Sequence, residues 1–252
     1  MPLSLLDELW DLHQNPKKRA LADLLESDLS IDEGQEIQLQ LLNRWLDQGE
    51  EIGGWKIGMT SGASRNAMGD GIRPFGFILQ SRVNPSETKL PLERLQNGGV
   101  ENEVCFSFSS LLSTDVTPEA ARNALSDIYP AFEINQKRLP QSAQNGLRVA
   151  DNLSNWGIVY GSGVDTEIEI NSIQVHLSHN GKEIQQTDSK GHIDDHYQSI
   201  ATLANKLGQY GHSIEVGHKV ITGAFGKAPF AEGTFQGTFS HGIGNVTVEL
   251  IK

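Results

Sequence analysis

The chain has 252 residues, a formal net charge of −12 and 37% hydrophobic residues. It is long and apolar enough for a buried core, and its acidity excludes the basic surface that nucleic acids or anionic lipids require. No apolar run approaches the roughly 20 residues of a membrane span, and the acidic start is unlike a signal peptide. Cys105 is the only cysteine, which excludes an internal disulfide and a thiolate metal site. We therefore expect a cytoplasmic protein.

The first fifty residues have apolar positions spaced as in helices. Leucines recur at helical intervals over residues 5–12 and 20–25. Ser30 and Glu33 have the spacing of a capping box, which predicts the start of a third helix. We expect residues 1–52 to form an N-terminal helical segment.

After residue 52 the pattern changes to short strands separated by glycine-bearing turns. Asn180-Gly181 indicates a hairpin, because both central positions of such a turn need positive φ. Two helices are expected among the strands, one opening at Thr117 and one over about residues 195–210. The prediction is an α+β chain in which residues 53–252 form a β-rich core, with helices outside and the whole chain in one compact unit.

The most informative feature is Glu101-Asn102-Glu103, at the head of a predicted strand over residues 100–108. Residues two apart in a strand share a face, so Glu101 and Glu103 project together. Two like charges side by side cost energy unless a positive group lies between them, and a hard divalent cation is one solution. Glu133, inside the predicted strand YPAFEINQ, also needs a partner. Three glutamates without histidine or cysteine favour Mg²⁺ or Mn²⁺ over zinc.

Simpler interpretations stay open for these charged residues. An E-x-E pattern also occurs on the solvated face of an antiparallel sheet, and Glu133 can pair with Lys137 or Arg138. Lys56, among apolar neighbours, is either a lysine with a depressed pKa suited to proton transfer or a strand-edge lysine in water.

Two further segments place polar residues in an apolar frame. In VADNLS, Asp151, Asn152 and Ser154 can orient a ligand or a metal-binding glutamate, or can form a turn between strands. In ITGAFG, the amides and hydroxyl of Thr222-Gly223 can bind a carboxylate, although turn geometry explains the glycine equally well.

Other motifs exclude several enzyme classes. The glycine spacing fits neither a P-loop nor a dinucleotide fingerprint, and no G-x-S-x-G is present. His192 and His196 lack the H-E-x-x-H context of a zinc site, and we expect both on a helix surface. A covalent hydrolase is not expected.

In this order the segments resemble the 2-oxo-pent-4-enoate hydratase and 4-oxalocrotonate decarboxylase family, within the fumarylacetoacetate-hydrolase superfamily. The resemblance covers nearly the whole chain and is carried by GWKIGMTS, ENE, PAFEI, VADNLS and ITGAFG. It implies a mixed β-sheet roll behind an N-terminal helical segment, a homo-oligomer and a role in aromatic catabolism.

The resemblance also implies roles for particular residues. The metal ligands would be Glu101, Glu103 and Glu133, the active-site lysine Lys56, and the substrate-site residues Ser154, Thr222 and Gly223, with Asp151 and Asn152 supporting them.

The implied reaction is hydration of a 2-oxo-3-enoate formed from a 2-hydroxy-2,4-dienoate. Mg²⁺ or Mn²⁺ would bind the 1-carboxylate and 2-oxo group and so give an acidic protein local positive charge. The same enolate chemistry allows decarboxylation of a 2-oxo-3-enedioate such as 4-oxalocrotonate, or acylpyruvate-type carbon–carbon hydrolysis.

A catalytically inactive 2-oxo-acid-binding or assembly partner is an alternative of another class. Departures from the family pattern keep this alternative open. Pro74 and His218 stand where relatives have acidic residues, and Gly98-Gly99-Val100 precedes E-x-E where relatives often have Pro-Arg.

Overall fold

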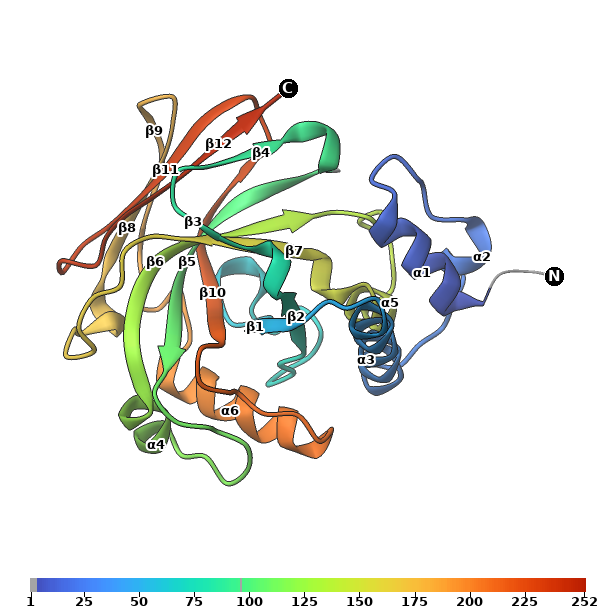
Figure 1. The fold of residues 1–252 in the computed structure, drawn as a ribbon, viewed down its shortest axis with the longest axis horizontal. Coiled ribbons are helices and arrows are strands. Elements are labelled where there is room, and N and C mark those ends of the chain that lie inside the picture. The colour runs from blue at the N-terminus through green and yellow to red at the C-terminus, as the bar shows by residue number, and fades with distance from the viewer. Residues whose placement is uncertain (1–3, 96) are drawn as a thin grey trace.

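The computed structural model describes residues 4–95 and 97–252 (Figure 1). The helices of this part of the chain are α1 (Leu5–Gln14), α2 (Ala22–Leu25), α3 (Ile31–Asp47), α4 (Pro118–Asn123), α5 (Asn145–Ala150) and α6 (His196–Gln209). The strands are β1 (Ile52–Ile57), β2 (Phe75–Leu79), β3 (Val83–Pro85), β4 (Thr88–Pro91), β5 (Gly98–Phe108), β6 (Leu125–Gln136), β7 (Asn155–Tyr160), β8 (Gln174–His179), β9 (Lys182–Asp188), β10 (Lys219–Pro229), β11 (Gly233–Phe239) and β12 (Gly244–Ile251).

The N-terminal helices begin where their caps predict. Ser30 caps α3, and its side chain and that of Glu33 exchange the two hydrogen bonds of a capping box. Ser4 and Asp7 do the same for α1. The predicted helix over residues 20–25 is only the single turn α2, whose N-cap makes no side-chain hydrogen bond. In Figure 1 these helices and α5 lie together beside the sheets.

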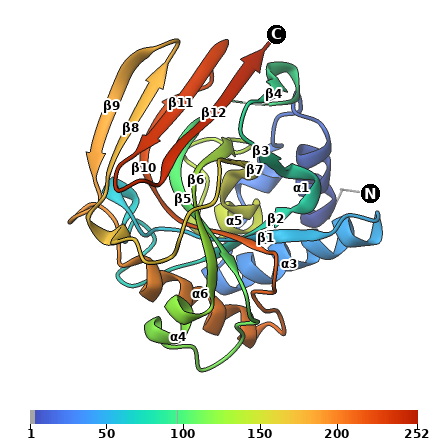
Figure 2. The same cartoon turned by 60° about the vertical axis from the view of Figure 1, so that its left-hand side comes forward.

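The strands form two sheets that stand against each other (Figure 2). The seven-stranded sheet has the order β2-β1-β10-β5-β6-β7-β3, and the five-stranded sheet has the order β4-β12-β11-β8-β9. The predicted hairpin joins β8 to β9, with Asn180 at φ 51° and Gly181 at φ 76°. The α+β prediction, with a mixed β-sheet roll and peripheral helices, is confirmed.

The long strands β5 and β6 form the centre of the larger sheet, and both of their faces are buried. Val104 and Phe106 pack into the main core on one face, while Cys105 packs with Ala131 and Ile221 on the other. The alternation of apolar and polar residues therefore does not mark a solvent face here, because other elements cover both sides of these strands.

The glycines ahead of the E-x-E pair allow close strand packing. A Cβ on Gly98 would lie 1.9 Å from the carbonyl oxygen of Asn135, and one on Gly99 would lie 2.3 Å from that of Ala228. Larger residues at these two positions would push β5 away from its neighbours.

The ITGAFG segment, predicted as a turn after a strand, instead lies within β10. Its pairing with β5 is interrupted between Ile221 and Ala224 and again before Gly226. These bulges leave Thr222 and Gly223 outside the regular ladder. The glycines that suggested a turn therefore mark irregular pairing inside a strand.

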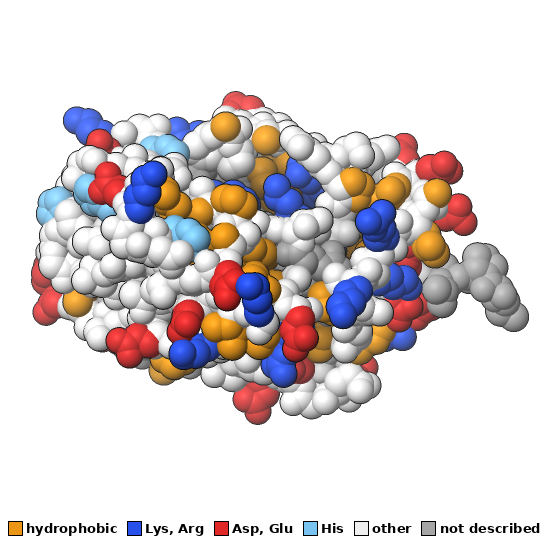
Figure 3. Space-filling model, turned by 90° about the horizontal axis from the view of Figure 1, so that it is seen from above, with side chains coloured by type: hydrophobic (Ala, Val, Ile, Leu, Met, Phe, Trp, Pro, Cys, Tyr) orange, Lys and Arg blue, Asp and Glu red, His pale blue; other side chains and the backbone are white. Residues whose placement is uncertain are grey.

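Surface charge is mixed on the face in Figure 3, where lysine and arginine side chains alternate with acidic ones and no extended basic patch forms. None of the described helices is long and apolar enough to cross a bilayer.

Candidate metal and substrate site

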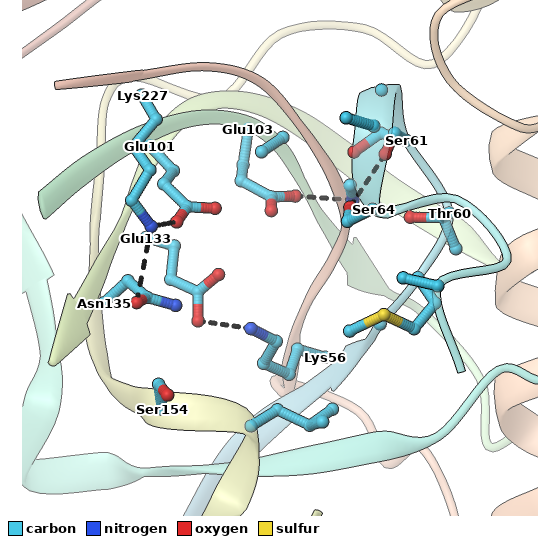
Figure 4. Close-up of a pocket in the computed structure, with 18 of the residues that line it drawn as sticks. Lys56, Thr60, Ser61, Ser64, Glu101, Glu103, Glu133, Asn135, Ser154 and Lys227 are labelled. Carbon is cyan, nitrogen blue, oxygen red and sulfur yellow. Dashed lines mark hydrogen bonds and ion pairs between the residues drawn. The ribbon is translucent and has the colours of Figure 1, made fainter. Parts of the chain in front are cut away.

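A cavity of about 610 Å³ opens on the larger sheet beside the E-x-E pair. Strands β1, β5, β6 and β10 contribute one part of its wall, and the loop after β1 and the segment from the end of β6 to Ser154 contribute most of the rest. Gln185 of β9 and His192 complete the lining. Figure 4 shows that Lys56, Glu101, Glu103 and Glu133 all point into this space.

Strand register brings the three glutamates together. Glu101 on β5 is directly opposite Glu133 on β6, and Glu103 lies two residues further along the same face. One carboxylate oxygen from each residue lies within 4.8 Å of those of the other two. Glu103 and Glu133 are buried and Glu101 is half-buried. The E-x-E pair, Glu101 and Glu103, is therefore not on a solvated sheet face.

Two lysines face the carboxylates. Lys56 Nζ donates to Glu133 Oε1 at 2.5 Å, and Lys227 forms an ion pair with Glu101, its neighbour across β10 and β5. Lys56 is 7% exposed, which rules out the strand-edge interpretation. Glu133 pairs with Lys56 and with neither Lys137 nor Arg138 in the described contacts. We call Lys56, Lys227, Glu101, Glu103 and Glu133 together the carboxylate–lysine cluster.

The electrostatics of Lys56 differ from the expectation of a depressed pKa. Burial alone would lower its pKa, but Glu133 and the two other glutamates outweigh burial and raise the pKa of Lys56 above its ordinary value. Lys56 is therefore an ammonium at neutral pH in the metal-free protein. The sequence could not show this, because it depends on strand register.

The pKa of Glu103 is also raised, which for a carboxyl group disfavours the charged form. Burial raises its pKa well above the usual range, and the nearby charge of Glu133 adds to this effect against the smaller influence of Lys56. The backbone amide of Gly223 donates to Glu103 Oε2 at 2.6 Å, in the bulged part of β10. Glu103 is thus held in place while its negative charge remains costly.

Asn155 orients the third glutamate. Its Nδ2 donates to Glu133 Oε1 at 2.9 Å. Sequence reasoning missed Asn155, although it directly follows the VADNLS segment, and also missed Lys227, which directly follows ITGAFG. Neither residue carries a local sequence signal, because its role depends on a contact with a glutamate that is distant in the sequence.

Only two of the three predicted substrate-site residues line the cavity. Ser154 and Gly223 line the cavity. Thr222 is fully buried behind it, where its Oγ1 forms a 2.7 Å hydrogen bond with Nδ1 of His196. The Thr222 hydroxyl is therefore directed away from the cavity, because the bulge turns neighbouring residues to different sides.

Asp151 and Asn152 were expected to support the glutamates, and neither contacts one among the described residues. Asp151 Oδ1 accepts from Arg138 Nε at 2.7 Å and also bonds with His13. Asn152 accepts from the amide of Phe77 at 2.8 Å and donates to its carbonyl at 2.9 Å. Both residues anchor the segment that carries Ser154 and Asn155.

The expectation of two surface histidines on a helix is wrong. His196 begins α6 but is fully buried, and burial lowers its pKa to about 4. His192 lies before that helix and lines the cavity, with Nε2 at 3.2 Å from the carbonyl oxygen of Ala224. The i,i+4 spacing misled because only one of the two residues is helical.

No family model matches the chain. A 2-hydroxypent-2,4-dienoate hydratase from Pseudomonas putida is 28% identical over 220 residues, which cover 84% of this chain and 99% of the hydratase. A 4-oxalocrotonate decarboxylase from a Pseudomonas species is 25% identical over 203 residues, covering 78% of this chain and 77% of the decarboxylase.

Among solved structures, the 4-oxalocrotonate decarboxylase from Pseudomonas putida G7, complexed with magnesium and adipate, superposes with a TM-score of 0.86 at 21% identity. The match covers 98% of this chain and 96% of that one. The fold is that of the fumarylacetoacetate-hydrolase superfamily. Within this fold, the chain is similar in sequence to 2-keto-4-pentenoate hydratases and 4-oxalocrotonate decarboxylases, the proteins that its motifs resemble.

Proposed function

We propose that the chain is a divalent-metal-dependent lyase that hydrates a 2-oxo-3-enoate formed from a 2-hydroxy-2,4-dienoate. The observation that carries this proposal is the carboxylate–lysine cluster. Three carboxylates face two ammonium groups there, so the cluster has one excess negative charge. A buried excess charge is costly, and a divalent cation would convert it into one excess positive charge. That charge matches the single carboxylate of a 2-oxo acid.

The donor set fits Mg²⁺ or Mn²⁺. Both ions prefer carboxylate oxygens, and the cluster offers Glu101, Glu103 and Glu133 without histidine or cysteine. When bound, the cation supplies Lewis acidity that stabilises negative charge on the 2-oxo oxygen of the substrate. Burial raises the pKa of Glu103, so its carboxylate is one whose negative charge a bound cation would stabilise.

The protein's own residues then position the reactants and move protons. Lys56 Nζ, kept charged by Glu133, donates the proton that forms the new C5–H bond when the dienol becomes the 2-oxo-3-enoate. The enol hydroxyl gives up its own proton in the same tautomerisation, which restores the Lys56 ammonium. Gly223 and Asn155 fix Glu103 and Glu133, and Ser154 lines the space where substrate and the added water would lie. Adding water then forms a C4–O bond and a C3–H bond, and Lys56 can pass the proton that the water loses to C3.

The relatives support this proposal. The Pseudomonas putida relative is named a 2-hydroxypent-2,4-dienoate hydratase, and its 99% coverage means that the likeness spans that whole enzyme. The structural neighbour with magnesium and adipate supports a site for a divalent cation and an organic acid. Aromatic catabolism follows as the proposed context.

Decarboxylation is the second candidate. It is favoured by the 25% identical 4-oxalocrotonate decarboxylase. Loss of carbon dioxide from a suitably placed second carboxylate would give the same enolate, so both reactions use the same cluster.

Turnover of metal-stripped protein tests the proposal. 2-Hydroxypenta-2,4-dienoate and 2-oxohex-3-enedioate are supplied with and without Mg²⁺, while dienol absorbance and carbon dioxide are followed. We expect metal-dependent loss of the dienol without carbon dioxide. Metal-dependent carbon dioxide release would move the assignment to decarboxylase, and no metal-dependent turnover of either acid would overturn both.

We also propose that the chain assembles as a homo-oligomer and that residues 1–52 form a helical unit packed on a catalytic core at residues 53–252. Mass measurement of the native protein and limited proteolysis between α3 and β1 test these two points.

A further inference from the structure

Arg148 is a positive charge in the cavity that the carboxylate–lysine cluster does not use. It lies in the last turn of α5, is half-buried and lines the same cavity. Its guanidinium makes no ion pair, hydrogen bond or cation–π contact with any residue in the described part of the chain.

The other buried or half-buried arginines all have partners. Four of them form ion pairs with aspartates, and the fifth, Arg82, lies over two tryptophan rings. The four ion-paired arginines are Arg44, Arg65, Arg73 and Arg138. A guanidinium has five donors in a fixed fork that matches a carboxylate. In a chain with a net charge of −12, an unpaired arginine facing a cavity is a feature that a ligand would explain.

The rest of the cavity wall suits a carbon chain. Met59, Met68, Leu139 and Leu153 line it along with Arg148. The exposed Lys137 also lines it and adds charge of the same sign. The cavity therefore offers a cluster for the 2-oxo acid group, apolar side chains, and a second site of positive charge.

We propose that the substrate is a dicarboxylate whose distal carboxylate is held by Arg148. This inference rests on the proposed function, because the cluster must bind the 2-oxo acid end for Arg148 to meet the other end. With a divalent cation, the cluster would carry one excess positive charge for the 2-oxo acid end, and Arg148 and the exposed Lys137 supply the positive charge for the distal carboxylate.

The same contact favours hydration over decarboxylation. An arginine stabilises the distal carboxylate as an anion, whereas loss of carbon dioxide moves that charge to the enolate. Arg148 would therefore stabilise the ground state of decarboxylation more than its transition state. Hydration leaves the distal carboxylate intact throughout, so the contact costs that reaction nothing.

A structural role for Arg148 is the competing explanation, because a cation in the last turn of a helix interacts favourably with the helix dipole. Such a role would change stability but not the choice between ligands. The test therefore uses two unreactive 2-oxo acids of equal chain length, 2-oxoadipate and 2-oxohexanoate, which differ by a terminal carboxylate and a terminal methyl group.

Their dissociation constants are measured by calorimetry on Mg²⁺-loaded protein and on Arg148→Met. Arg94→Met is the control, since Arg94 is exposed and lies outside the cavity lining. We expect wild type to bind 2-oxoadipate about ten- to a hundredfold more tightly than 2-oxohexanoate, as a charge-assisted hydrogen-bonded pair would give. Arg148→Met should lose this preference with unchanged 2-oxohexanoate affinity, and Arg94→Met should keep it.

Three results would overturn the inference, and they differ in what they say of the proposed function. Equal, Mg²⁺-dependent affinity for both acids, or a preference that survives in Arg148→Met, would overturn the dicarboxylate assignment and leave the proposed function in place. Failure of both acids to bind in the presence of Mg²⁺ would overturn the dicarboxylate assignment and the proposed function together.

Discussion

Lys56 is the residue on which the proposed proton transfer depends. Its ammonium is buried against Glu133, and its pKa is raised by the surrounding carboxylates. A lysine in this state is an acid with a fixed position and differs from the low-pKa base that its apolar neighbours suggested. The identity of its partner decides its chemistry.

Replacement of Lys56 by Met should lower kcat by about 10²- to 10⁴-fold, the usual contribution of a positioned acid or base. Removing its charge from beside Glu133 should leave Mg²⁺ affinity equal or stronger. Steady-state kinetics and metal titration measure the two effects, with Lys89→Met, an exposed lysine paired with Glu249, as control. Wild-type kcat in Lys56→Met would remove Lys56 from the mechanism.

Asn155 acts on the site through Glu133. Because the partners that orient metal ligands typically contribute 10–100-fold to metal affinity, Asn155→Ala should weaken Mn²⁺ binding by about that factor. Asn123→Ala, an exposed asparagine at the end of α4, serves as control. Unchanged Mn²⁺ affinity in Asn155→Ala would show that the 2.9 Å hydrogen bond to Glu133 has no positioning role.

At the scale of elements, the turn between α5 and β7 decides where the cavity wall lies. Asn152, Leu153 and Ser154 have φ values of 57°, 49° and 63°, so three successive residues other than glycine are left-handed. Such residues each cost of order 1–3 kcal/mol and persist only when neighbours hold them. The two hydrogen bonds between the Asn152 side chain and the backbone of Phe77, one accepted and one donated by Asn152, provide that hold.

Asn152→Ala should therefore destabilise the protein by on the order of 3 kcal/mol, since it leaves a buried amide and a buried carbonyl of Phe77 without partners. It should also raise KM, because Leu153 and Ser154 line the cavity. Denaturant unfolding and kinetics measure this. Asn180→Ala, at another left-handed asparagine in an exposed hairpin, should cost much less. Equal losses would contradict an anchoring role.

Elements set by local signals could be predicted from sequence. Capping residues gave the start of α3, and Asn180-Gly181 gave the β8–β9 hairpin, because neighbours in the chain determine both. The ITGAFG segment misled because its glycines allow either a turn or a bulge. Only pairing with β5 makes it a bulge, and that partner is far away in sequence.

The same limit applies to the site. The E-x-E spacing predicted that Glu101 and Glu103 share a face, which follows from strand geometry alone. That Glu133 lies opposite Glu101 depends on the register of β5 and β6. The direction of the Thr222 hydroxyl and the burial of His196 depend on how α6 packs behind β10, which no local pattern records.

At the scale of the whole molecule, a buried network joins the N-terminal helices to the core. His13 of α1 contacts Asp151, which also pairs with Arg138, just after the end of β6. Burial, aided by Arg138, lowers the pKa of His13 to about 4. At neutral pH the 3.1 Å contact between His13 and Asp151 is therefore a hydrogen bond from an uncharged ring.

This network predicts acid sensitivity. The pKa values of His13 and His196 are both lowered to about 4 in the folded protein, so the folded state binds fewer protons than the unfolded state. The stability that each contributes is fully present above pH 6.5 and is lost as pH falls through about 4. The loss is on the order of 3 kcal/mol per histidine.

Urea unfolding between pH 7.5 and pH 4.5 measures this loss. His13→Gln should be less stable at pH 7.5 but show a flatter decline, whereas His241→Asn, at an exposed position of positive φ, should keep the wild-type slope. A wild-type slope in His13→Gln would contradict the burial of an uncharged His13.

Binding of Mn²⁺ and pyruvate, followed by electron paramagnetic resonance of the metal, tests the central claim most directly. We predict that wild type binds one Mn²⁺ per chain and that Glu133→Gln loses most of its Mn²⁺ affinity. Glu93→Gln, at an exposed position, is the control and should bind Mn²⁺ as wild type does. Adding pyruvate should change the spectrum of the bound Mn²⁺. Mn²⁺ that binds Glu133→Gln as well as wild type, or a spectrum that pyruvate does not change, would contradict a metal centre that binds 2-oxo acids.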